Sequence, residues 1–232
     1  TSNGASGPES QTAVNVPVTL ASPSSGTTTV DYYVDSGSRS SLSSTTAAPT
    51  LPYWTRVVRA GSSLTSYISS DGVIWQLVGT TQTFTMSSTS YTAGLVAMSS
   101  SSGVSCTATL DNLSITGLDV GGASGAAVFG SVGTTSPAST SSETGGVYTL
   151  NAGGAGLSTT GTSDTSCYVS FAITNSANCT ITARVTGITN GNNTSRAGVM
   201  IRESSATGSR HMTTVAEKAG TARMIRRSST SA

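Results

Sequence analysis

The stretch Tyr53–Met86 constrains the fold of this chain most strongly, because it combines strand-like alternation with a strong turn signal. Residues 64–69 alternate between two sets of side chains with a period of two, as in a strand whose two faces meet different surroundings. The tripeptide Ser-Asp-Gly at 70–72 follows, and Asp-Gly between two such runs favours a hairpin turn with positive φ. We therefore predict a β-meander whose return strand covers Val73–Val78.

The composition of the 232 residues favours an all-β chain, with room for one large sandwich or two smaller units. Thr forms strands well, and Ser and Gly favour turns. Only 9% of residues are charged and the net charge is +1, which excludes strong electrostatic attraction to nucleic acid or an anionic membrane. No run of 18 apolar residues predicts a transmembrane helix. The chain has a single lysine, Lys218, and many Ser and Thr residues. This composition resembles that of bacterial surface proteins, so we expect an extracellular or cell-surface location.

The three cysteines suggest a disulfide but no metal site. Cys167 and Cys179 flank a hairpin expected around residues 175–177, so they could face each other across it. The alternative is two small buried thiols. We expect Cys106 to lie in the core, and no Cys/His spacing matches a zinc site. We therefore expect neither a metal nor a cofactor.

The segments outside the meander predict strands, loops and one linker. Val14–Leu20 and Thr27–Val34 are predicted strands, and the segment VNVPVTLASPSSGTTTVDYYV resembles one hairpin of a Calx-β domain. Residues 36–50 are expected to form a loop. Residues 117–144 are mostly Gly, Ala, Ser and Thr, which is typical of a linker.

Seven of the eleven basic residues lie between Arg196 and Arg227, together with Glu203 and Glu217. This part of the chain reads as three strands, 197–204, 210–216 and 221–227. We interpret its charges as solvated strand faces with cross-strand ion pairs, and the alternative is a basic ligand patch.

Several motifs together resemble a known superfamily. GVYTL, TITARVTGI, AGVMIRES, GSRHM and ARMIRRSST, in this order, resemble the first half of a bacterial extracellular module of the concanavalin A-like lectin/glucanase (laminin-G-like jelly-roll) superfamily. PYWTRVVRAGSSLTSYISSDGVIWQLVG, YTAGLVAMS and TATLDNLSIT resemble its second half, which comes first in this chain. The resemblance implies an antiparallel β-sandwich, a jelly roll, split into two half-domains.

This reading divides the chain into four parts. They are an N-terminal hairpin and loop (1–50), a second jelly-roll half (51–118), a linker (119–145) and a first half (146–232). Neither half can bury its core alone. The halves could close on each other in one chain, as a circular permutation, or complete each other between neighbouring chains. A repeated contact of the second kind that does not close gives a filament. A third possibility is one window of a long tandem array.

The sequence lacks the constellations that would indicate an enzyme. The E-x-D-x-x-E motif of the superfamily's glucanases is absent, which argues against glycosidase activity. His211 is the only histidine, and no G-x-S-x-G motif surrounds any serine, so we read His211 as a strand residue. The pair Asp111-Asn112 has a single carboxylate, which supplies too few oxygen ligands for Ca²⁺. We therefore interpret this pair as a turn or edge position.

We therefore expect a non-enzymatic extracellular structural protein that assembles head to tail with copies of itself, by strand or half-domain complementation. The alternative is a carbohydrate-binding module, in which Trp54, Trp75 and Tyr67 could stack on a sugar ring, although core packing is the preferred reading for them. Asn192 and Asn193 each match the N-glycosylation pattern in a loop expected to be exposed. Residues expected to line the core of an inter-chain interface are Trp54, Val58, Val199, Ile201 and Met224, with Trp54 as the anchor.

Overall fold

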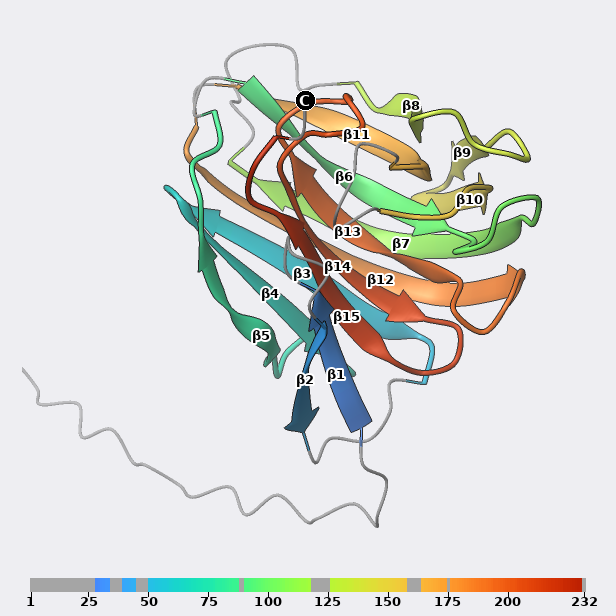
Figure 1. Ribbon diagram of the computed structural model, residues 1–232, viewed down its shortest axis with the longest axis horizontal. Helices are drawn as coiled ribbons and strands as arrows, with labels where there is room; N and C mark the ends of the chain where they lie inside the picture. The colour runs from blue at the N-terminus through green and yellow to red at the C-terminus, as the bar shows by residue number, and fades with distance from the viewer. Residues whose placement is uncertain are drawn as a thin grey trace, which may run out of the picture.

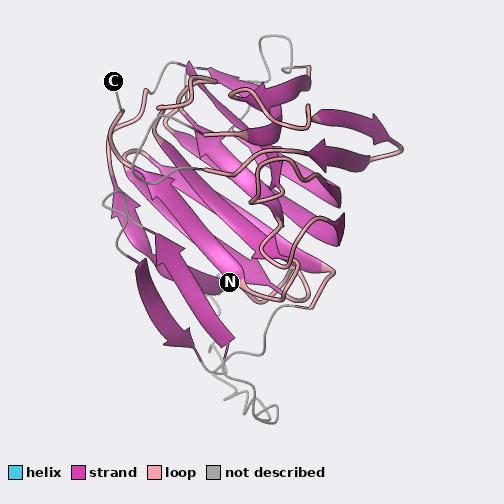
Figure 2. Cartoon of the chain, turned by 45° about the vertical axis from the view of Figure 1, so that its right-hand side comes forward, coloured by secondary structure: helices cyan, strands magenta, loops and turns pink. Residues whose placement is uncertain are grey.

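The computed structural model describes residues 50–87, 90–117, 126–157, 164–174 and 176–230, together with the backbone of 28–33 and 39–44. Every regular element in these ranges is a β-strand (Figures 1 and 2). Among the described residues, no helix is long and apolar enough to cross a membrane. The prediction of an all-β chain is confirmed.

The strands, in chain order, are β1 Thr28–Tyr33, β2 Arg39–Ser44, β3 Tyr53–Ala60, β4 Ser63–Ser69, β5 Gln76–Thr83, β6 Ser90–Met98, β7 Cys106–Thr116, β8 Val128–Val132, β9 Thr140–Thr144, β10 Val147–Ala152, β11 Ser166–Thr174, β12 Asn178–Asn190, β13 Arg196–Arg202, β14 His211–Glu217 and β15 Ala222–Arg227.

These strands form two sheets packed as a β-sandwich. Sheet A has the order β2-β1-β15-β14-β13-β6-β11-β8, and sheet B has the order β5-β4-β3-β12-β7-β10-β9. All neighbours are antiparallel except β1 and β15, which run parallel. One lateral edge of the sandwich is therefore formed by β2 and β5, and the other by β8 and β9 (Figure 1).

The two predicted halves pair with each other within one chain. β12, from the second part of the sequence, lies in sheet B between β3 and β7. β13 pairs on one side with β6, from the first part, and on the other with β14. The residues of 51–118 and 146–232 thus close one sandwich within a single chain, and each part supplies central strands to both sheets.

The main core lies between the sheets and follows the predicted alternation. In β4, Leu64, Ser66 and Ile68 point inward and are at most 2% exposed. Val199, Ile201 and Met224, expected at an inter-chain interface, are fully buried in this intramolecular core. They therefore stabilise the fold of a single chain, because their partners are already supplied by that chain.

A smaller apolar cluster covers the opposite, outer face of sheet A. It includes Met98, Met200 and Ile225, together with Leu157 from the connection between β10 and β11. An isolated antiparallel bridge between Gly156 and Thr165 joins the two described ends of that connection. Sheet A is thus buried on both faces near this connection.

The tryptophans do not fill the core, contrary to expectation. Trp54 is only partly buried, because Tyr53 and Thr55 occupy the inward positions of β3 and the intervening side chain must point outward. Val58 lies on the same outer face and is also only partly buried. Trp75 is partly exposed in the loop before β5. Trp54 therefore cannot act as the buried anchor predicted for it.

The turn between β4 and β5 is longer than the turn predicted at residues 70–72. Oδ1 of Asp71 accepts hydrogen bonds from the backbone N–H groups of Val73 and Ile74, each at 2.8 Å, and from the Ser69 hydroxyl at 2.9 Å. Hydrogen bonds from these two N–H groups, Ile74 first, lower the pKa of Asp71. Because this cap holds Val73 and Ile74 in the turn, the return strand begins at Gln76.

Two segments predicted to be irregular contain strands. β2 lies in the expected loop 36–50, and β8 and β9 lie in the expected linker. Their small side chains show little hydrophobic periodicity in the sequence. Each of these strands nevertheless pairs with a neighbouring strand through backbone hydrogen bonds. β1 falls within the predicted strand Thr27–Val34, whereas Val14–Leu20 lies outside the described residues.

The predicted disulfide is wrong, because all three cysteines are free and buried. Cys167 lies on β11 in sheet A and Cys179 on β12 in sheet B, so the two strands do not form the expected hairpin. Burial raises the pKa of each of these two thiols to about 11. Burial also raises the pKa of Cys106.

We expect the native protein not to react with Ellman's reagent, since a thiol that is buried and protonated is a poor nucleophile. After unfolding in guanidinium chloride, all three cysteines should react without prior reduction. Fewer than three reactive thiols in the unreduced, unfolded chain would contradict this assignment.

Candidate functional site

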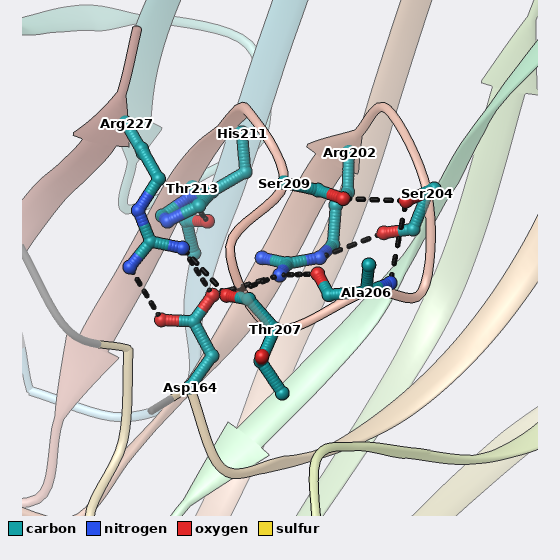
Figure 3. A network of polar contacts seen from close by, with 9 residues as sticks. All are labelled: Asp164, Arg202, Ser204, Ala206, Thr207, Ser209, His211, Thr213 and Arg227. Carbon is teal, nitrogen blue, oxygen red and sulfur yellow. Dashed lines mark hydrogen bonds and ion pairs between the residues drawn. The ribbon is translucent and has the colours of Figure 1, made fainter. Parts of the chain in front are cut away.

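The most concentrated group of polar side chains is a buried ionic cluster at one end of sheet A (Figure 3). The carboxylate of Asp164 accepts from Arg202 Nη2 at 2.7 Å and from Arg227 Nη1 and Nη2 at 2.7 and 2.9 Å. The side chains of Asp164 and Arg202 are fully inaccessible, and that of Arg227 is 2% exposed. Two guanidinium groups therefore share one carboxylate away from solvent.

Strand register brings the two arginines together. Arg202 on β13 is the cross-strand partner of His211 on β14, and His211 is the partner of Arg227 on β15. Side chains at one register position point to the same face of a sheet, so an Arg-His-Arg row lies on the outer face of sheet A. Asp164 reaches this row from the connection between β10 and β11.

Backbone carbonyls add further hydrogen bonds to the arginines, although Nη1 of Arg202 has no partner among the described residues. Arg202 donates through Nε to Ser204 O at 2.8 Å and through Nη2 to Thr207 O at 3.0 Å. Arg227 Nη1 donates to the same Thr207 carbonyl at 2.6 Å. The cluster thus fastens two connections, β10–β11 and β13–β14, to the face of the sheet.

A second shared carboxylate lies at the far end of the same strands. Glu217 Oε1 accepts from Arg196 Nε at 2.7 Å and from Arg223 Nε at 2.6 Å, and its side chain is 3% exposed. The predicted cross-strand ion pairs are therefore present, but the prediction that these faces are solvated is wrong. Five of the seven basic residues in this part of the chain are held in buried or half-buried pairs.

His211 is confirmed as a strand residue and is completely buried. Its Nδ1 lies 3.1 Å from the Thr213 hydroxyl, and among the described residues its Nε2 has no hydrogen-bond partner. Burial, and then the positive charges of Arg202 and Arg227, hold its pKa well below 6.5. The imidazole is therefore neutral in the folded protein.

We expect the free energy of unfolding to fall as the pH is lowered through 6.5, because the unfolded chain then binds a proton that the folded chain does not. The slope contributed by this one group reaches about 1.4 kcal/mol per pH unit below that point. Urea unfolding of the native chain and of His211→Asn across this range measures it. An identical slope in both proteins would show that His211 is not its source.

Aromatic and basic side chains gather on the outer face of sheet B. The guanidinium of Arg56 stacks 3.5 Å from the centroid of the Trp75 ring, and Arg184 lies 5.8 Å from that of Trp54. Arg184 also forms a two-point ion pair with Asp111, which lowers the pKa of that carboxyl. Both indole rings are thus partly covered by cations rather than by the core.

An open pocket of about 410 Å³ lies on the same sheet, lined by Asp111–Leu113 and Gly145–Tyr148. β7 bulges here, and Asn112 adopts a positive φ of 50°. The pair Asp111-Asn112 thus lies at a bulge within β7, which has β12 and β10 as neighbours in sheet B, and not in the turn or at the sheet edge predicted for it. The pocket is lined by backbone groups, by the Asn112 amide and by the Asp111 carboxylate, which is paired with Arg184.

The two predicted glycosylation sites differ in their surroundings. Asn192 and Thr194 are both exposed, and Asn192 Oδ1 accepts from the Thr194 hydroxyl at 2.8 Å. Asn193 is exposed as well, but the hydroxyl of its acceptor partner Ser195 is buried and donates to Ser99 O at 3.0 Å. Asn192 is therefore the more accessible acceptor in the folded protein, and its glycosylation stays a prediction.

The lateral edges of the sandwich are unusual in their composition. β8 and β5 contain no charged residue and no proline. Exposed apolar side chains lie at both edges: Val128 and Phe129 in β8 are 63% and 45% exposed, and Val73 and Ile74, in the turn before β5, are 78% and 60% exposed. These edges are a feature that sequence reasoning missed, because the strand positions were not recognised.

Within the described ranges, no group of three or more His, Cys, Asp or Glu side chains could hold a metal ion. Comparison of the chain with protein-family models, with curated proteins and with solved structures found no match. The resemblance to the concanavalin A-like superfamily therefore stays a prediction.

Proposed function

We propose that this chain is a non-enzymatic structural module of a bacterial extracellular protein, and that it assembles with copies of itself through the open edges of its sandwich. The observation that carries this proposal is the β8 edge. Its outer side pairs with no strand in the part of the chain that the structure describes, and two of its side chains are exposed and apolar.

An open strand edge offers a row of unpaired backbone N–H and C=O groups to another chain. Folded monomers commonly block such edges with Lys, Pro or inward-pointing charge, and β8 has none of these. Strand addition at such an edge combines main-chain hydrogen bonds with burial of apolar side chains. The proposed assembly does not involve exchange of half-domains between chains, because the two halves already pair within one chain.

The test compares the native chain with Val128→Lys by light scattering and negative-stain microscopy over a range of concentrations. The native chain should form elongated species, and the lysine variant should lose them because a charge at the edge opposes burial. Ser114→Lys, on an exposed central position of sheet B, adds the same charge away from the edges and should assemble normally. A native chain that stays monomeric would contradict the proposal.

A carbohydrate-binding module is the second candidate, and the pocket beside the β7 bulge favours it. Asp111, Asn112 and the backbone of 145–148 line one open surface, and a carboxylate, an amide and backbone groups suit the hydroxyl groups of a sugar. Calorimetric titration of the native chain and of Asn112→Ala with soluble polysaccharides tests this candidate. Heat of binding that Asn112→Ala leaves unchanged would place any glycan elsewhere.

A further inference from the structure

We propose that the predicted strand Val14–Leu20 of one copy adds to the free edge of β8 in a neighbouring copy. This inference rests on the proposed function and names the segment that the β8 edge binds. Val14–Leu20 precedes β1 in the chain and lies outside the described residues. Its sequence gives the character of the donor, and the described sandwich gives the edge that receives it.

The first support is that β1 leaves no complete edge for this segment. The predicted hairpin would pair Val14–Leu20 with residues 27–34, which contain β1. In the structure, β2 pairs with all six residues of β1 on one side, and β15 pairs with residues 31–33 on the other. A strand formed by Val14–Leu20 must therefore find its hydrogen-bonding partner elsewhere.

The second support is that the main core remains open at the β8 edge. Phe129 is the cross-strand partner of Val169 on β11, and Val169 is fully buried between the sheets. Side chains at one register position point to the same face, so Phe129 faces the space between the sheets, yet it is 45% exposed. A strand added outside β8 with one apolar face would cover Phe129 and extend this core.

The third support is the pattern of the donor. Its apolar side chains, at 14, 16, 18 and 20, share one face of a strand, and Asn15 and Thr19 share the other. Neither Val14–Leu20 nor β8 contains a charged residue, so their pairing buries no charge. Pro17 has no N–H and fits an edge strand when its nitrogen points away from the partner. There it would block the addition of a further strand.

Distance assigns the donor to a neighbouring copy. In sheet A, β1 and β8 are six strand positions apart, so a strand outside β8 would lie seven positions from β1. At about 4.8 Å per position this separation is about 34 Å. Leu20 precedes Thr28, the first residue of β1, by eight residues, which span only about 26–29 Å when fully extended. The segment therefore cannot lie along the β8 edge of its own chain.

Each copy then has one donor segment and one receiving edge. The donor joins the sandwich at β1, near one lateral edge of sheet A, whereas β8 forms the opposite edge (Figure 1). A contact between two different surfaces that repeats in this way adds copies in a line.

The experiment mixes two variants, each blocked at one partner. Val16→Lys places a charge in the donor and keeps the native β8 edge, whereas Val128→Lys blocks the edge and keeps the native donor. Each variant alone should lose all elongated species. Their mixture should give a one-to-one pair and nothing longer, measured by light scattering with mass-labelled chains. Gln11→Lys adds the same charge before the alternating residues and should assemble as the native chain does.

A synthetic peptide of residues 12–22 provides a second measurement that does not depend on the folding of any variant. In millimolar excess over the native chain, it should occupy the β8 edge and shorten the elongated species. The same peptide with Val16→Lys should leave their length unchanged. Equal effects of the two peptides, or no effect of either, would contradict the assigned donor.

Each other result of the mixing experiment has a distinct meaning. If Val16→Lys assembles normally while Val128→Lys does not, the β8 edge binds another surface and this inference is wrong, although the proposed function stands. If both variants fail alone and their mixture forms no pair, the segment and the edge do not bind each other, and the inference is again wrong. If the native chain itself remains monomeric, the proposed function fails and this inference fails with it.

Discussion

Replacing Asp164 by Ala should lower the free energy of unfolding by about 3–5 kcal/mol, because it leaves two buried guanidinium groups without their carboxylate. Arg202 is fully buried and Arg227 nearly so, which means that water cannot replace the lost partner without opening the structure. Urea unfolding of the native chain and the variant at neutral pH measures the loss.

A carboxylate with a partly exposed partner provides the control. Glu203 pairs with Arg210 at 3.3 Å, and the two side chains are 21% and 31% exposed. Glu203→Ala should therefore cost no more than about 1 kcal/mol, as exposed ion pairs generally do. Similar losses for the Asp164 and Glu203 variants would show that burial does not set the strength of the Asp164 cluster.

A triple variant separates uncompensated charge from lost packing. Changing Asp164 to Leu together with Arg202 and Arg227 to Met removes all three charges and keeps most of the volume. Replacing a complete buried ionic group by apolar side chains is often neutral or stabilising, whereas removing one partner is costly. The triple variant should thus be more stable than Asp164→Ala, and the reverse order would contradict the role assigned to charge.

The sequence predicted this fold well where one face of a strand was clearly more apolar than the other. In β4, Leu64 and Ile68 share a face, and both are buried as expected. In β3 the two faces were nearly equivalent: Tyr53 and Val57 on one side, Trp54 and Val58 on the other. Since a shift of one residue reverses every side chain of a strand, hydrophobicity alone could not decide which set faced inward.

The ionic cluster could not be predicted, because its members come together only through the order of the strands. Asp164 is a single acidic residue in a stretch of Gly, Ser and Thr, with no local pattern around it. The row of Arg202, His211 and Arg227 depends on the register of three strands, which the turns between them set. The density of basic residues was visible in the sequence, but their burial was not.

A second large loss of stability is expected from a substitution in the core that the two halves share. Ile201 on β13 is fully buried between the sheets and pairs with Ala93 of β6 and Met212 of β14. Ile201→Ala should lower the free energy of unfolding by about 2–5 kcal/mol, the range for large-to-small changes in a packed core. Thermal or urea unfolding of the purified chains measures it.

The same change at an exposed isoleucine, and a larger change at Trp54, complete the comparison. Ile74 is 60% exposed, so Ile74→Ala should alter the stability of the fold by no more than about 0.5 kcal/mol. Trp54 lies on the outer face of sheet B against Gly72 and, at 5.8 Å, Arg184, so Trp54→Ala should cost less than Ile201→Ala although it removes more atoms. Burial, not side-chain size, sets this order, because only the inward side chain leaves a cavity behind. A Trp54 variant less stable than the Ile201 variant would place the tryptophan in the core after all, and would reverse the assignment of the two faces of β3.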